Sequence, residues 1–150
     1  MLGYIIAKLY YINNSLIWMD LKILNIASDT DNCRIIENHT HRSKLKNYLC
    51  GDEVIIELVV KDNIIIDFGY QGNSCAYCQA SASLLSKISI NNQKDTISKL
   101  CDEANFFFDR KINSINKQEL LLKKLFTKKN LPRKECILLP FKTLKKIVSN

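Results

Sequence analysis

The spacing of apolar and polar residues predicts a helix followed by a small sheet. Apolar residues recur at helical spacing from Leu16 to Ile26, with Ser15 as a cap and the polar run 28–32 as a stop. Residues 41–49 are typical of a short polar strand at a sheet edge. Residues 53–60 are rich in β-branched side chains, and residues 64–70 return after a tight turn at 61–63. These three segments predict an antiparallel meander.

After Gly72 the pattern becomes helical. We expect helices at about 75–89, 94–109 and 117–128, and a last helix after Leu131-Pro132. Sheet and helices are therefore segregated along the chain, which predicts an α+β fold with an N-terminal helix, a three-stranded antiparallel meander and a cluster of C-terminal helices. We expect residues 1–14 to be an N-terminal extension and residues 15–150 to be a single domain.

Composition narrows the class of protein. The chain has 150 residues, 47% of them hydrophobic, so it can bury a core without disulfides. No apolar run reaches the roughly 18–20 residues of a membrane span, and no secretory signal is convincing. We therefore expect a cytoplasmic protein with no membrane partner.

The formal net charge of +7 is concentrated in residues 101–150, which hold 12 basic and 5 acidic groups. Such a segment is either a solvated helical surface or a docking surface for an acidic partner. Because no glycine-rich loop or interleaved aromatic and basic stripe accompanies it, we expect no nucleic-acid partner.

Three of the six cysteines fall where predicted elements meet. Cys50 lies in the turn between the first two strands, and Gly51 allows Asp52 to point to the same side. Cys75 begins a helix, where the helix N-terminus favours a thiolate, and Cys136 lies near the start of the last helix. Three thiolates and one carboxylate would complete a four-coordinate site for zinc or iron. From these residues alone, scattered buried thiols remain the alternative.

The other chemistry-bearing residues are expected to be ordinary. Cys75-Ala76-Tyr77-Cys78 is a single CxxC and a weak metal or redox signal, so Cys78 is expected to be a plain helix residue, with a sulfur relay as the alternative. Six further residues have no neighbouring motif that would make them metal ligands, and we expect them to lie at the surface or to have no role in a site: Cys33, His39, His41, Glu57, Asp67 and Cys101.

Four stretches taken together resemble a known family. They are Cys50-Gly51-Asp52, Gly72-Asn73-Ser74-Cys75, Gln79-Ala80-Ser81-Ala82-Ser83, and Arg133-Lys134-Glu135-Cys136 followed by Leu138-Leu139-Pro140-Phe141. In this order and spacing they look like the iron–sulfur scaffold proteins of the IscU, SufU and NifU N-terminal type. The resemblance extends from about Leu16 to Val148, nearly the whole chain.

The resemblance implies that Cys50, Asp52, Cys75 and Cys136 bind zinc or hold a transient [2Fe–2S] cluster. It also implies that a cysteine desulfurase delivers sulfur as a persulfide, with Cys136 and Cys50 as candidate acceptors, and that apo iron–sulfur proteins receive the cluster. Thiolates are soft ligands for iron and nucleophiles toward persulfides. An aspartate is a harder and weaker ligand than a fourth cysteine, which should keep the cluster labile.

Two departures refine the resemblance. The IscU branch has a histidine just before its last cysteine, whereas this chain has Glu135, and the missing histidine resembles the SufU branch. Leu131-Pro132-Arg133-Lys134 only partly matches the chaperone-binding stretch of the IscU branch. A dedicated Hsp70-type chaperone is therefore not implied. Two functions stay open: a non-enzymatic scaffold that assembles and transfers iron–sulfur clusters, and a zinc-dependent sulfurtransferase partner of a cysteine desulfurase.

Overall fold

The computed structural model describes residues 20–109 and 120–150, and the order of its elements confirms the predicted α+β class. Its elements are α2 (Leu21–Ala27), β1 (His41–Lys46), β2 (Glu53–Lys61), β3 (Ile64–Gln71), α3 (Ala76–Ser89), α4 (Lys94–Phe108), the 3₁₀ segments Leu122–Lys124 and Lys128–Arg133, and α5 (Lys134–Val148). The predicted extension at 1–14 and the helix start at Ser15 lie outside the described residues.

The three strands form the predicted meander. They pair antiparallel in the order β1-β2-β3, with His41 opposite Leu58 and Ile56 opposite Tyr70. Asp62 and Asn63 both have positive φ, 50° and 64°. Two such residues make the tight turn whose twist matches the flanking strands, and Asn and Asp tolerate this conformation best after glycine. The turn at 61–63 is thus explained by local chemistry.

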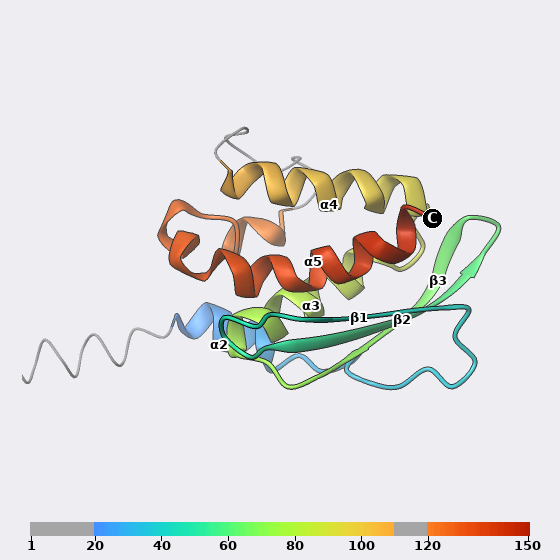
Figure 1. Ribbon diagram of the computed structural model, residues 1–150, viewed down its shortest axis with the longest axis horizontal. Coiled ribbons are helices and arrows are strands. Elements are labelled where there is room, and N and C mark those ends of the chain that lie inside the picture. The colour runs from blue at the N-terminus through green and yellow to red at the C-terminus, as the bar shows by residue number, and fades with distance from the viewer. Residues whose placement is uncertain (1–19, 110–119) are drawn as a thin grey trace, which may run out of the picture.

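The helices cover one face of the sheet. Helices α3 and α5 lie directly against it, and α4 packs on the outer side of α5 (Figure 1). Ile56, Leu58 and Phe68 point into this layer and are fully buried, as are Leu85 and Phe141 from the helices. The period-2 alternation of β2 and the apolar stripes of the helices therefore meet in one core. Within the described ranges, no helix combines the length and the apolarity needed to cross a bilayer.

The helix predicted at 117–128 is wrong for the part that the structure describes. From residue 120 the chain forms only short 3₁₀ turns before α5. Leu122 and Leu125 are fully buried, but the Asn130 side chain donates a hydrogen bond of 2.8 Å to the carbonyl of Leu125. In an α-helix that carbonyl would accept from the backbone four residues later. The apolar residues at helical spacing are buried as expected, but they are buried from short 3₁₀ turns and not from an α-helix.

Glu57 is buried, which contradicts the expectation that it is solvated. It lies on the sheet face opposite the helices, but the segment that leads into β1 crosses this face. The Ile36 amide donates to Glu57 Oε2 at 2.8 Å, and Arg42 Nε lies 3.3 Å from Oε1. Gly69, opposite Glu57, makes room for the crossing chain, because a Cβ there would lie 2.6 Å from the carbonyl oxygen of Arg34. Strand alternation alone could not reveal this cover.

Replacing Glu57 with alanine should lower the free energy of unfolding by about 2–3 kcal/mol, since it strands a buried amide and removes the partner of Arg42. The matched control is Asp67→Ala, which removes the half-exposed partner of Arg34 and should cost at most about 1 kcal/mol. Urea unfolding of both variants measures the difference. Equal costs would mean that Glu57 does not anchor the crossing segment.

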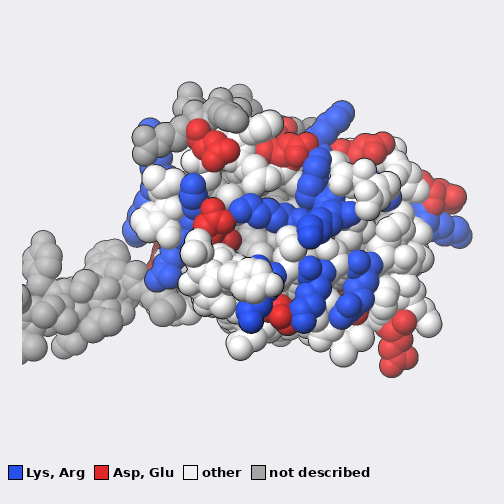
Figure 2. Space-filling view, viewed as in Figure 1, with Lys and Arg blue, Asp and Glu red and all other residues white. Residues whose placement is uncertain are grey.

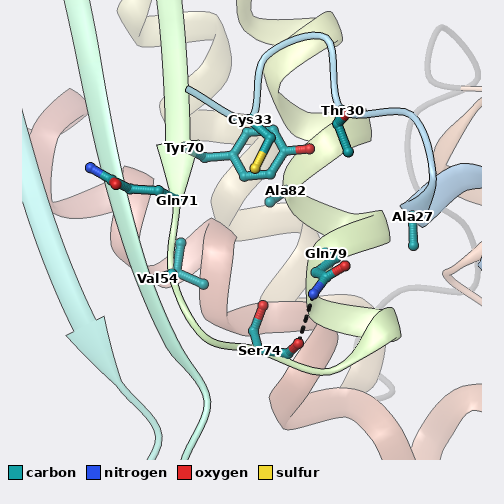
Figure 3. Close-up of a pocket in the computed structure, with 10 residues that line it drawn as sticks. Ala27, Thr30, Cys33, Val54, Tyr70, Gln71, Ser74, Gln79 and Ala82 are labelled. Carbon is teal, nitrogen blue, oxygen red and sulfur yellow. Dashed lines mark hydrogen bonds between the residues drawn. The ribbon is translucent and has the colours of Figure 1, made fainter. Parts of the chain in front are cut away.

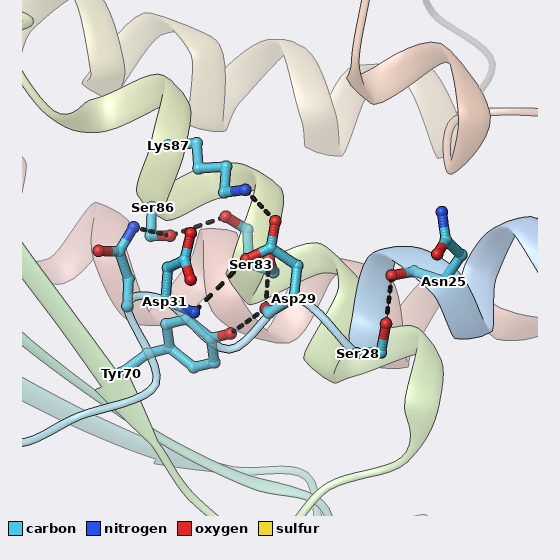
Figure 4. A network of polar contacts seen from close by, with 9 residues as sticks. Asn25, Ser28, Asp29, Asp31, Tyr70, Ser83, Ser86 and Lys87 are labelled. Atoms are coloured by element: carbon cyan, nitrogen blue, oxygen red, sulfur yellow. Dashed lines mark hydrogen bonds and ion pairs between the residues drawn. The ribbon is translucent and has the colours of Figure 1, made fainter.

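Polar contacts also tie the segment after α2 to α3 (Figure 4). The backbone carbonyl of Asp29 accepts hydrogen bonds from Ser83 Oγ at 2.9 Å and from Tyr70 Oη at 3.4 Å. The Asp29 carboxylate pairs with Lys87, whose hydrogen bond lowers the pKa of that carboxyl. The Ser83 side chain thus links α3 to the segment that follows α2.

Two lysines of α5 and one of β1 form ion pairs on the same face of the molecule. Lys and Arg side chains gather over β1 and α5 on the face shown in Figure 2. On α5, Lys142 Nζ lies 2.8 Å from Glu135 and Lys145 Nζ lies 2.8 Å from Asp102; on β1, Lys44 lies 3.0 Å from Glu53. Each of these three lysines therefore has a carboxylate as its immediate neighbour.

Candidate metal centre

Three segments distant in sequence meet at one end of the molecule. The turn between β1 and β2, the start of α3 and the start of α5 all lie at the end where α2 packs (Figure 1). Cys50 and Asp52 belong to the first segment, Cys75 is the N-cap of α3, and Cys136 is the third residue of α5. Each of the four candidate ligands is therefore presented by a turn or a helix start.

Cys50, Asp52 and Cys136 share one small space. One ligand atom from each, the two sulfurs and a carboxylate oxygen, lie within 4.8 Å of one another. Gly51 makes this approach feasible, because its φ of +79° lets the turn reverse between Cys50 and Asp52. Cys50 is exposed, whereas Asp52 and Cys136 are each 7% exposed. The space is thus closed behind and open on the side of Cys50.

Asp52 contributes one satisfied and one unsatisfied oxygen. Oδ1 accepts a hydrogen bond of 3.1 Å from the Cys75 amide. Oδ2 is buried and accepts no hydrogen bond from the described residues. A buried carboxylate oxygen without a donor is costly unless a cation fills the space beside it. Two sulfurs next to this oxygen make a donor set that suits zinc or iron.

Cys75 borders this space without joining the three-atom cluster. Its backbone caps α3 and its amide donates to Asp52, and its thiol is close enough to Cys136 to add to the rise that burial causes in the pKa of that thiol. The four predicted ligands are therefore neighbours, but only three present their ligand atoms to one point.

The Cys136 thiol is electrostatically unfavourable to ionise in this setting. Burial raises its pKa to about 12, and the neighbouring Cys75, Cys50 and Asp52 add to the rise. A bound cation would offset the repulsion between these groups and so favour their ionised, negatively charged forms. The electrostatics agree with the unsatisfied oxygen of Asp52.

Close packing of α3 on α5 sets the separation between Cys75 and Cys136. Ser81 Oγ donates a hydrogen bond of 2.6 Å to the backbone carbonyl of Ile137. Ala80 and Ala82 are almost fully buried beside it, and small residues allow two helices to approach closely. Ser81 is thus a positioning residue that the Ala-Ser-Ala-Ser run, a family signature in the sequence, did not by itself predict. The feature of the sequence that points to this close helix contact is the run of small residues at 80–83, which precedes the larger apolar residues of the same helix.

Glu135 and Arg133, which lie just before Cys136, both have partners outside the cluster of Cys50, Asp52 and Cys136. Glu135 pairs with Lys142, so its carboxylate is engaged along α5. The Arg133 guanidinium lies 5.4 Å from the centre of the Tyr77 ring, which joins the starts of α5 and α3.

The remaining chemistry-bearing residues lie elsewhere, with one exception. His41 begins β1 at the end of the strand away from Cys50, and His39 bonds to the Ile36 carbonyl. Cys101 is buried beside Asp102 and Lys145, and burial raises its pKa to about 12. Cys78 is the exception: it is fully buried one helical turn behind Cys75 and interacts with the charges of the cluster.

A separate small pocket lies between α2, α3 and the end of β3 (Figure 3). It encloses about 100 Å³ and is lined by Cys33, Tyr70 and Gln79, among others. This volume is below the roughly 300 Å³ of a typical ligand site. Its lining includes none of the four predicted ligands, so it is distinct from the candidate metal centre.

The sequence is similar to a known family and to named proteins. The family described as "NifU-like N terminal domain" matches residues 20–107. The chain is 36% identical to the iron–sulfur cluster assembly scaffold protein IscU of Thermotoga maritima, over 67% of this chain and 70% of that protein. It is 28% identical to an uncharacterized protein of Borreliella burgdorferi, over 73% and 72% of the two chains.

The fold is similar to that of solved structures. A putative iron–sulfur cluster assembly scaffold for the SUF system from Fervidobacterium islandicum matches with a TM-score of 0.78 and 25% identity, over 89% of this chain and 97% of that one. A NifU-like protein (N-terminal) from Brucella abortus matches with a TM-score of 0.77 and 19% identity, over 85% and 90%. The latter similarity concerns the fold alone.

Proposed function

This chain belongs to the family of NifU-like N-terminal domains, and from that premise we propose that it is a scaffold on which iron–sulfur clusters are assembled and passed on. Cys50, Asp52, Cys75 and Cys136 hold the iron, with the cluster as cargo rather than as a resident cofactor. The protein is a carrier and breaks no substrate bond by acid–base chemistry. Cysteines 33, 50, 75, 78, 101 and 136 are all free thiols, which agrees with a reducing, cytoplasmic setting.

One observation carries the proposal: a buried Asp52 oxygen without a donor lies within 4.8 Å of two cysteine sulfurs at the rim of the molecule. The mixed donor set supports transient holding, since carboxylate oxygen is a weaker ligand for iron than thiolate. The open side at Cys50 supports loading and release without unfolding.

Sulfur delivery is the second part of the proposal. A Cys50 or Cys136 thiolate attacks the outer sulfur of a desulfurase persulfide; the S–S bond breaks, and the desulfurase cysteine leaves as a thiolate. Cys50 is exposed and accessible to a large donor, whereas Cys136 is 7% exposed. Exposed apolar side chains beside the site, Tyr48 and Leu49 in the same turn and Leu21 on α2, offer a surface for such a partner.

The alternative within the same family is a zinc-dependent sulfurtransferase. There zinc would be held by Asp52 and the thiols and would orient and deprotonate them, with one cysteine released to take sulfur. Anaerobic reconstitution with iron and sulfide separates the two. A scaffold develops visible charge-transfer absorption and transfers its cluster to an apo-ferredoxin. Retention of zinc with sulfur acceptance alone would overturn the scaffold proposal in favour of the alternative.

Replacing Asp52 with cysteine should slow cluster release at least several-fold. A fourth thiolate binds iron more strongly than a carboxylate, so the cluster dissociates less readily. The measurement is the rate at which an apo-ferredoxin acquires its visible spectrum from the preloaded variant. The matched control is Cys33→Ser, an exposed thiol outside the site, which should transfer at the original rate. Transfer from the Asp52 variant at an unchanged rate would contradict a role for this oxygen in lability.

A further inference from the structure

Cys75 is one of the proposed iron ligands, and Cys78, three residues further along the chain, is a thiol that the proposed function does not use. Cys75 caps α3 and is partly exposed, while Cys78 lies three residues further along and is fully buried. Residues three apart in a helix lie on the same face, with Cβ atoms about 5–6 Å apart. Disulfides span Cα separations of about 4.4–6.8 Å. A disulfide also requires Cβ atoms about 3.5–4.5 Å apart, so closing the pair requires Cys75 to shift at the N-cap, where its backbone is extended (φ −71°, ψ 167°) and lies outside the regular helical turn.

The order of exposure within the pair sets a direction of reaction. Cys75 is partly exposed and can be reached from outside, whereas Cys78 is fully buried and shielded from solvent. Burial is the largest cause of the raised pKa of the Cys78 thiol, and Cys78 lies close enough to Asp52, Cys75 and Cys136 for their negative charges to raise that pKa further. An exposed first thiol with a buried second thiol behind it is the arrangement in which a mixed disulfide is resolved internally.

We propose that Cys75 and Cys78 are a thiol–disulfide exchange site that takes small disulfides such as oxidised glutathione. The Cys75 thiolate attacks the small disulfide, forms a mixed disulfide and releases one thiolate. Cys78 then attacks the Cys75 sulfur and its proton leaves with the second small thiol. The protein dithiol loses two electrons and becomes a disulfide, and the small disulfide is reduced to two thiols.

Closing this disulfide has a consequence for the metal centre. It ties the Cys75 sulfur to Cys78 on α3 and removes the thiol that now lies near Cys136 and adds to the rise that burial causes in the pKa of that thiol. Oxidation therefore withdraws one candidate ligand, and a dithiol reductant restores it. The exchange reaction is independent of the proposed scaffold function, whereas its effect on metal loading rests on that function.

The test treats the metal-free protein with oxidised glutathione and analyses the peptide 62–87, whose only cysteines are Cys75 and Cys78. In the native chain this peptide should lose two hydrogens and carry no glutathione. In Cys78→Ser it should carry one glutathione on Cys75, because nothing resolves the mixed disulfide. In Cys75→Ser it should stay unmodified, because Cys78 is inaccessible. The control Cys101→Ser should behave like the native chain.

Three results would overturn the exchange site: stable glutathione on Cys75 of the native chain, a disulfide from Cys75 to Cys50 or Cys136, or no reaction at Cys75. Zinc uptake by the oxidised protein is a separate readout. It should fall at least ten-fold and recover with dithiothreitol. A disulfide that forms without loss of zinc uptake would support the exchange site and remove Cys75 from the ligand set.

Discussion

Cys136→Ser should weaken zinc binding on the order of 100-fold or more and abolish retention of a reconstituted cluster. Serine keeps the size of the side chain but replaces a soft sulfur by a hydroxyl that does not ionise near neutral pH. Cys136 is one of the three residues whose ligand atoms lie within 4.8 Å of one another, so its loss leaves only Cys50 and Asp52 at that point. Competition with a chromogenic chelator measures the zinc affinity, and visible absorption after anaerobic reconstitution measures the cluster.

The matched control for this substitution is Cys33→Ser. Cys33 is exposed and lies outside the cluster of ligand atoms, so its serine variant should bind zinc and retain the cluster as the native chain does. Circular dichroism of both variants shows whether the fold is retained. If folded Cys136→Ser keeps its metal and still accepts sulfur from a desulfurase, Cys136 is neither a ligand nor an acceptor.

Gly72→Ala should lower the free energy of unfolding by ~3 kcal/mol or more. Gly72 leads from β3 toward the N-cap of α3 with a φ of +150°, which L side chains rarely adopt. A Cβ at this position would lie 2.0 Å from the backbone carbonyl oxygen of Glu53, so the two segments must separate. Because Cys75 follows three residues later and its amide bonds to Asp52, the displacement should also weaken metal binding.

Gly51→Ala is the matched control, since Gly51 also has a positive φ but a Cβ there meets nothing within 4 Å. It should cost only about 1–2 kcal/mol, the usual price of the left-handed conformation. Urea unfolding of the two variants separates conformational strain from steric clash. Equal losses would mean that close approach to Glu53 adds nothing at Gly72.

The sequence was sufficient for those features that depend on neighbours in the chain. The alternation in β2, the Asp62-Asn63 turn and the helical stripe of α5 are local patterns, and each formed where predicted. The donor types were also readable, because a Cys-Gly-Asp turn and two cysteines at helix starts have few other uses together. From these residues alone scattered buried thiols stayed an alternative, and the resemblance to the scaffold family made a metal site the prediction.

Non-local packing decided the rest. Glu57 became buried because the chain before β1 crosses its face of the sheet, and the described part of the helix predicted at 117–128 forms short turns in which Asn130 bonds to the Leu125 carbonyl. The same holds at the candidate centre, where the contact between α3 and α5 sets how close Cys75 comes to Cys136. Distances between segments far apart in sequence arise from side-chain volumes filling a shared core, so a local pattern names the donors but only the folded chain determines which of them meet.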